Sequence, residues 1–105
     1  MYESTSDLND QSSGRMKQLI LEIVQALVDQ PDAVSVELIE DREATVLCVR
    51  VAPQDIGKVI GKQGRTARSL RTILGAASMK LHHRFALDII EDDDGLEDER
   101  QPRAS

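Results

Sequence analysis

Two glycines, Gly61 and Gly64, stand in the most basic stretch of this chain. Residues 58–71 contain five lysines and arginines and no acidic residue, although the whole chain carries a net charge of −6 at pH 7. A glycine leaves no side chain between the backbone and a ligand, so a sugar–phosphate chain can lie close to such a loop. The nearby cations supply charge-assisted contacts to phosphate oxygens. The spacing therefore indicates a site for a polyanionic chain.

Both flanks of this loop have the spacing of helices. Residues 55–60 are expected to form a short helix, with Pro53 to Asp55 as its capping region. Residues 65–79 place apolar side chains at helical intervals and predict a longer helix. A helix that starts directly after Gly64 would point free N–H groups and the positive end of its dipole at the loop. This setting favours phosphate contact over a plain turn between helices.

The basic stretch stands out because the acidity of the chain lies elsewhere. The net charge divides into −3 for residues 1–14, +1 for residues 15–91 and −4 for residues 92–105. The N-terminal extension and the C-terminal tail are polar as well as acidic, and we expect both to be disordered. A local basic surface decides phosphate binding more than the net charge of a chain does. One hypothesis is that the acidic ends compete with the bound polyanion for the basic stretch.

The remaining periodicity predicts one domain over residues 15–91. We expect a helix over residues 15–29 and strands over residues 34–40, 44–51 and 84–91. Together with the two helices around the loop, this order predicts an α+β domain in which three helices cover one face of a three-stranded sheet. On the other face, an apolar patch of Ile39, Val46, Cys48 and Ile90 would be available to a partner.

At this point the chain resembles a known family. Its segment GKVIGKQGR, Gly57 to Arg65, fits the V/I-I-G-x-x-G core of KH domains, and the element order resembles their type II arrangement, α-β-β-α-α-β. The stretches ALVDQPDAVSVELIE, VRVAPQDIGKVIGKQGRTARSLRTIL and FALDIIE, within residues 16–91, are similar to the small stand-alone bacterial KH proteins of the KhpA (YlqC) family. Ala67 departs from the pattern, which often has isoleucine there, and this is expected to loosen the packing under the loop or shift it to Leu70.

The resemblance implies a protein that holds about four nucleotides of single-stranded RNA in a groove beside the loop. The residues it implies in RNA contact are Lys58, Val59, Ile60, Gly61, Lys62, Gln63, Gly64, Arg65 and Arg68. It further implies an RNA-chaperone or post-transcriptional role, and a homodimer or a heterodimer with a KH protein of the KhpB (Jag/EloR) type. In some bacteria it links that pair to cell-wall synthesis and cell shape. The alternative is a KH-fold adaptor that pairs with such a partner, with RNA contact secondary.

Composition argues against several other classes of protein. The only aromatic residues besides histidine are Tyr2 and Phe85, so no sheet face can stack several bases. The single cysteine, Cys48, excludes an internal disulfide and a cysteine-rich zinc site. No apolar run approaches about 20 residues, and the N-terminus has no apolar signal region. We therefore expect a cytoplasmic protein that does not enter membranes.

Catalysis is not expected either. The sequence shows no nucleophile with a base, no paired acid and base, and no metal cluster. Residues 57–63 superficially resemble a P-loop, but the spacing is one residue short and Gln63 stands where that motif needs serine or threonine. His82 and His83 are adjacent and are expected in a surface turn. We expect no cofactor, no metal and no small-molecule substrate.

Overall fold

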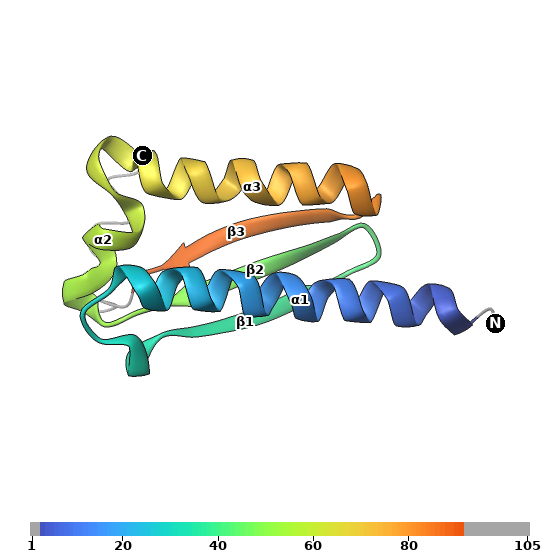
Figure 1. Ribbon diagram of the computed structural model, residues 1–105, viewed down its shortest axis with the longest axis horizontal. Helices are drawn as coiled ribbons and strands as arrows, with labels where there is room; N and C mark the ends of the chain where they lie inside the picture. The colour runs from blue at the N-terminus through green and yellow to red at the C-terminus, as the bar shows by residue number, and fades with distance from the viewer. Residues whose placement is uncertain (1–2, 92–105) are drawn as a thin grey trace, which may run out of the picture.

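The computed structural model describes residues 3–91, with side chains described from residue 11 onward. The helices are α1 (Glu3–Leu27), α2 (Ile56–Ile60) and α3 (Arg65–Leu81), and the strands are β1 (Ser35–Glu40), β2 (Ala44–Arg50) and β3 (Arg84–Ile90). Single turns of 3₁₀ helix lie at Pro31–Ala33, Pro53–Asp55 and Lys62–Gly64. Figure 1 shows this order, which confirms the predicted α+β fold with the element sequence of a type II KH domain.

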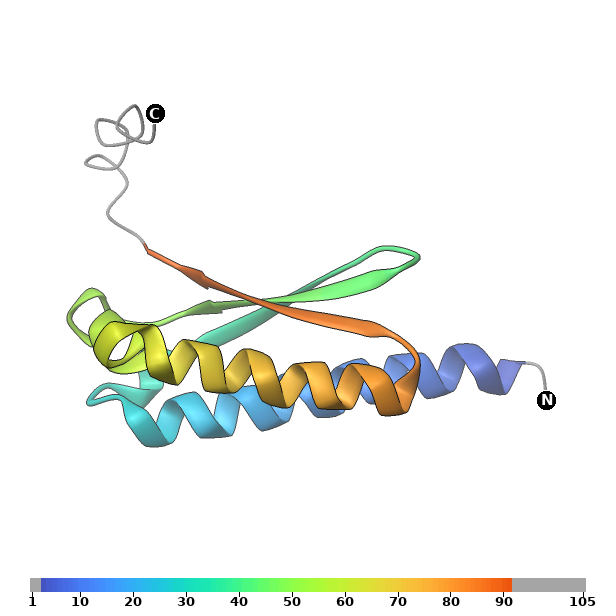
Figure 2. The same cartoon turned by 90° about the horizontal axis from the view of Figure 1, so that it is seen from above.

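The sheet topology brings the end of β3 to the start of α2. The strand order is β1-β2-β3, with β1 and β2 antiparallel and β2 and β3 parallel. Parallel pairing aligns the carboxyl ends of β2 and β3, and Arg50 is the partner of Ile90. The chain enters α2 within a few residues of Arg50, so α2 and the last residues of β3 share one end of the molecule. Figure 2 shows α1 and α3 on the same side of the sheet.

One hydrophobic core lies between the sheet and the helices. Alternate strand residues point toward the helices, as expected for a sheet covered on one face. The buried residues of the sheet include Val36, Leu47, Val49, Phe85 and Leu87, and those of the helices include Ile20, Val24, Val59, Leu70 and Leu74. Because all three helices contribute to this core, the packing of α2 and α3 on the sheet positions the connection between them relative to β3.

A buried carboxylate fixes the start of α2. Asp55 is 0% exposed, and its Oδ2 accepts a hydrogen bond from the backbone N–H of Gln30 at 3.0 Å. Lys58 Nζ lies 3.7 Å from Asp55 Oδ1 and 3.4 Å from Asp29 Oδ2. A buried carboxylate is tolerated only when hydrogen bonds and a countercharge compensate its lost hydration. This cluster therefore ties α2 to the chain that leaves α1.

The first helix is longer than the sequence pattern predicted. We expected residues 1–14 to be disordered and a helix from residue 15, but α1 begins at Glu3. Ser13 is 4% exposed, and Ser12 lines a hollow together with Ala77 and Leu81 of α3. Serine has a low helix propensity, so the burial of Ser13 shows that tertiary structure supports this part of the helix. The expectation for residues 92–105 lies outside the described residues and stays a prediction.

The outer face of the sheet carries a shorter apolar row than we predicted. Ile39 is the partner of Val46, Val46 is the partner of Ala86, and Ile39 is 58% exposed. Cys48 does not extend this row, because it is only 7% exposed and lies between Glu37 and Asp88 in the register, and Ile90 is separated from the row and has Arg50 as its partner. No helix among residues 3–91 has the length and apolar character to cross a membrane.

The Cys48 thiol is protected rather than reactive. Burial raises the pKa of Cys48 above its usual value, the carboxylates of Asp88 and Glu37 raise it further, and Arg50 opposes them. A thiol with a raised pKa stays protonated at neutral pH and is a poor nucleophile and metal ligand. Cys48 is therefore a packing residue.

Candidate functional site

The GKQG loop (residues 61–64) is a tight turn that only glycine permits at its first position. Gly61 has φ 80° and ψ 168°, and a Cβ placed there would collide with the side chain of Thr66 and lie 2.8 Å from its backbone nitrogen. The N–H of Gly64 donates to the carbonyl oxygen of Gly61 at 3.0 Å. Gln63, at φ 56°, and Gly64, at φ 73°, are both left-handed. The turn therefore exposes its backbone and leads directly into α3.

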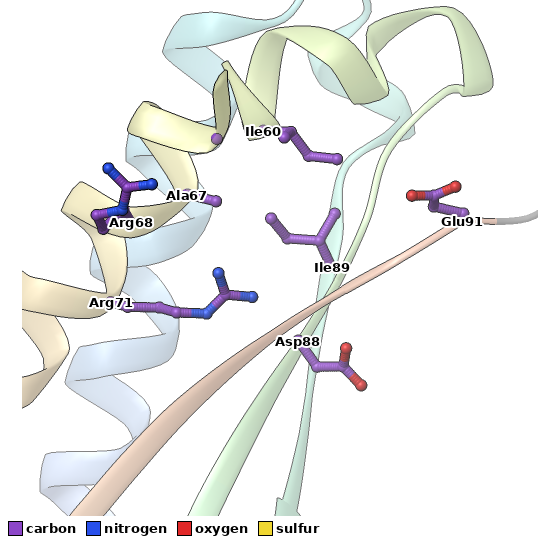
Figure 3. A pocket seen from close by; sticks show the side chains of 8 residues that line it. Ile60, Ala67, Arg68, Arg71, Asp88, Ile89 and Glu91 are labelled. Atoms are coloured by element: carbon purple, nitrogen blue, oxygen red, sulfur yellow. The ribbon is translucent and has the colours of Figure 1, made fainter. Parts of the chain in front are cut away.

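A groove lies beside this loop, between α3 and the end of β3 (Figure 3). Its cavity measures about 410 Å³ and is lined by Ile60, Gly64, Ala67, Arg68, Arg71, Asp88, Ile89 and Glu91. In Figure 3, Arg68 and Arg71 come from one wall and Asp88 and Glu91 from the other, with Ile60, Ala67 and Ile89 between them. The groove thus has a cationic wall, an apolar floor and an acidic wall.

The cations of the basic stretch are not equally available. The side chains of Lys62 and Arg68 are exposed and have no hydrogen bond or ion pair to any residue within the described range. Arg65 Nη2 donates to Gln63 Oε1 at 3.1 Å, which holds its guanidinium over the loop. Arg71 Nη2 donates to the carbonyl oxygen of Leu87 at 3.4 Å, which anchors it across the groove. Lys62 and Arg68 are therefore the cations most available to bind an anionic ligand.

Two of the expected contact residues lie away from the groove. Val59 is 0% exposed and belongs to the core, so its side chain cannot form the apolar edge that we expected of it. Lys58 is directed to Asp29 and Asp55, which neutralise it. Ile60 does form an apolar edge, because it is half-buried and lines the cavity. In the five-residue helix α2, Val59 and Lys58 therefore stabilise the fold, whereas Ile60 borders the groove.

The groove also contains residues that the sequence pattern did not single out as a site. Arg71 follows Arg68 by one helical turn, so helical spacing was the signal that could have placed both on one wall. Ile89 and Glu91 come from the far end of the chain, and only the parallel pairing of β3 brings them here. Ala67 is 4% exposed and still lines the cavity, so the residue that departs from the KH pattern leaves space under the groove.

The first turn of α3 makes this end of the groove electropositive. No side chain caps the helix, its N-cap is Gly64, and its first turn contains no acidic residue. The positive end of the helix dipole is therefore not offset locally, and it adds to the charges of Lys62, Arg65 and Arg68. Such an arrangement can hold the phosphates of an extended chain while its apolar floor receives flat, uncharged groups. Within residues 3–91 no cluster of His, Cys, Asp and Glu could hold a metal ion.

Comparison with known proteins decides the family of this fold. Residues 17–89 match the family model described as KhpA/KhpB, KH domain. The chain belongs to the KhpA/KhpB KH-domain family. The RNA-binding protein KhpA of Clostridium acetobutylicum is 47% identical over 75 residues, which cover 71% of this chain and 100% of that relative. KhpA of Halalkalibacterium halodurans is 49% identical over 76 residues, covering 72% and 100%, and KhpA of Borreliella burgdorferi is 44% identical over 78 residues, covering 74% and 95%.

A solved structure shares the fold at low sequence identity. The Era protein of Aquifex aeolicus superposes with a TM-score of 0.50 and 15% identity, over 73% of this chain and 31% of Era. This likeness concerns the fold alone. The three KhpA relatives named above, by contrast, match over 95% or more of their length, and the family match over residues 17–89 includes the GKQG loop.

Proposed function

We propose that this protein binds single-stranded RNA in the groove beside the GKQG loop. The observation that carries the proposal is the pair of uncommitted cations, Lys62 and Arg68, at the uncapped start of α3 and beside an apolar-floored cavity. The KhpA relatives are named RNA-binding proteins, which supports the same function. The protein is not an enzyme in this proposal, because the proposed contacts of the groove bind RNA and make or break no covalent bond.

In the proposed complex, the RNA backbone follows the loop and the first turns of α3. Phosphates contact Lys62, Arg65 and Arg68, and bases rest on the apolar floor around Ile60 and Ile89. Phe85, the one aromatic ring among the described residues apart from histidine, is 5% exposed and cannot stack on a base. Stacking therefore contributes little, and the affinity should be modest and strongly dependent on salt.

A titration of labelled single-stranded RNA, followed by fluorescence anisotropy, tests this function. With about three phosphate contacts, the binding constant should fall with salt at a logarithmic slope of about −2. The same sequence as a duplex should bind less tightly, because the loop and the apolar floor require an unstacked chain. Equal affinity for single and double strands, or binding indifferent to salt, would contradict the proposal.

Arg68 and Lys58 provide a matched pair of variants. Arg68→Ala should weaken RNA binding about 5- to 10-fold with unchanged stability, because it removes one charge-assisted phosphate contact. Lys58→Ala should change affinity less than about 2-fold but lower the free energy of unfolding by about 1–2 kcal/mol, because the buried Asp55 loses a countercharge. Anisotropy and urea unfolding measure the two effects. If Lys58→Ala weakened RNA binding and Arg68→Ala did not, the ligand would lie on the side of α2 that faces α1.

The cellular setting that we propose is an RNA chaperone or post-transcriptional regulator in the cytoplasm, acting as a homodimer or with a KhpB-type partner. A second candidate function is that of an adaptor, for which the specific observation is the apolar row on the outer face of the sheet, in which Ile39 is exposed and Val46 and Ala86 are half-buried. Affinity purification with and without RNase separates the two. Partners that survive RNase, together with no RNA crosslinked to the groove, would favour the adaptor.

A further inference from the structure

The last described strand, β3, ends beside the groove. Glu91, which follows β3, lines the same cavity as Arg68 and Arg71. Figure 3 shows its carboxylate on the wall opposite the two arginines. The next residues are Asp92, Asp93 and Asp94. A run of carboxylates therefore begins at the rim of the groove that we propose for RNA phosphates.

The charges of this segment and of the groove are complementary. Residues 92–99 contain six acidic residues and no basic one, whereas the stretch 58–71 contains five basic residues and no acidic one. Lys62 and Arg68 have no partner within the described residues, so they are open to carboxylates as well as to phosphates. The segment lies beyond residues 17–89, the part that matches the family. It is therefore an addition of this chain to the common domain.

The attachment point makes contact within the same molecule favourable. An extended chain spans about 3.3 Å per residue, so the eight residues 92–99 can reach about 26 Å from Glu91, which is enough to follow the groove toward the GKQG loop. A tethered ligand acts at an effective concentration in the millimolar range, so even weak carboxylate–arginine contacts would be populated.

We propose that the acidic segment 92–99 occupies the groove when RNA is absent and competes with RNA phosphates for Lys62 and Arg68. This regulation rests on the proposed RNA site. The segment raises the threshold for binding, so that an RNA able to fill the groove displaces it while weak polyanions do not. Salt weakens the contact because it screens the charges that make it.

The acidic residues at the N-terminus cannot act in this way. The start of α1 lies at the opposite end of the molecule from α2 and the loop (Figure 1). Helix α1 is continuous from Glu3 to Leu27, so its first turns are carried away from the groove. Removing three carboxylates from the N-terminal end is therefore a matched control for removing three carboxylates after Glu91.

Two full-length triple variants test the proposal, each lacking three carboxylates. One is Asp92→Asn, Asp93→Asn and Asp94→Asn, and the other is Glu3→Gln, Asp7→Asn and Asp10→Asn. Without RNA, amide NMR spectra of the C-terminal variant should differ from those of the unaltered protein at Gly64, Arg68 and Arg71. The N-terminal variant should leave these amides unchanged. Unchanged groove amides in the C-terminal variant would overturn the proposal.

RNA titrations of the same proteins complete the test. The C-terminal variant should bind single-stranded RNA about 3- to 10-fold tighter at low salt, and this gain should fall below about 2-fold near 0.5 M salt. Tighter binding without a change in the groove amides would mean general repulsion of RNA, and would also overturn docking of the segment. If none of the proteins binds RNA, the proposed function fails, whereas the RNA-free spectra still decide whether the segment occupies the groove.

Discussion

Replacing Lys62 and Gln63 together by aspartate should weaken RNA binding by at least about 100-fold and leave the fold intact, because the charge at the place where phosphates are held falls by three units. Both side chains are exposed, and neither belongs to the core. Gln63 adopts φ 56°, a conformation that aspartate enters more readily than most residues. An aspartate at 63 would also pair with Arg65, which now donates to Gln63, and would withdraw that cation from the ligand.

A matched control separates this local effect from the change in net charge. Lys17 and Gln18 are adjacent and exposed on α1, away from the groove, and Lys17→Asp with Gln18→Asp changes the charge by the same amount. That variant should retain RNA affinity within about 3-fold, since neither residue lines the groove and salt screens exposed charges that do not contact the ligand. Equal losses in both double variants, measured by anisotropy beside circular dichroism, would mean that the loop is not the site.

Substituting Gly61 should have the largest effect on stability among changes in the loop. Gly61→Ala is expected to lower the free energy of unfolding by about 3 kcal/mol, because its φ and ψ suit glycine almost alone and because the new Cβ meets Thr66. Gly64→Ala is expected to cost only about 1 kcal/mol, since φ 73° is a milder strain and a Cβ there meets open space. Urea unfolding of the two variants measures the difference.

A second substitution divides the Gly61 effect into its causes. Thr66→Ala in the Gly61→Ala background removes the side-chain collision but not the backbone strain or the close approach to the Thr66 nitrogen. We therefore expect partial recovery of stability. Equal costs for alanine at 61 and 64, or complete recovery, would show that the loop relaxes and that its backbone geometry is not a requirement of the fold.

The order of elements and the loop could be predicted because their signals are local. Alternation marked the strands, helical spacing marked α3, and the glycine pair marked the turn between helices. The start of α1, by contrast, has no such local signal in the sequence. Residues 3–14 are polar and have weak helical periodicity, and the burial of Ser13 beside the end of α3 depends on tertiary structure.

The orientation of side chains around the loop depended on tertiary structure. Helix α2 has only five residues, too few for periodicity to tell that Val59 points into the core while Ile60 borders the groove. The pairing of Lys58 with Asp55 required the chain to fold back onto the end of α1. The acidic wall at Asp88 and Glu91 required the parallel pairing of β2 with β3. In each case the missing information was a contact between residues on different elements.

The most direct test of the central claim is an amide NMR titration of the full-length protein with a single-stranded RNA. The largest chemical-shift changes should follow the groove, at Gly61, Gly64, Arg68 and Ile89, and the Lys62→Asp, Gln63→Asp variant should lose them. Changes centred instead on the outer sheet face around Val46, with the groove amides unmoved, would contradict RNA binding in the groove.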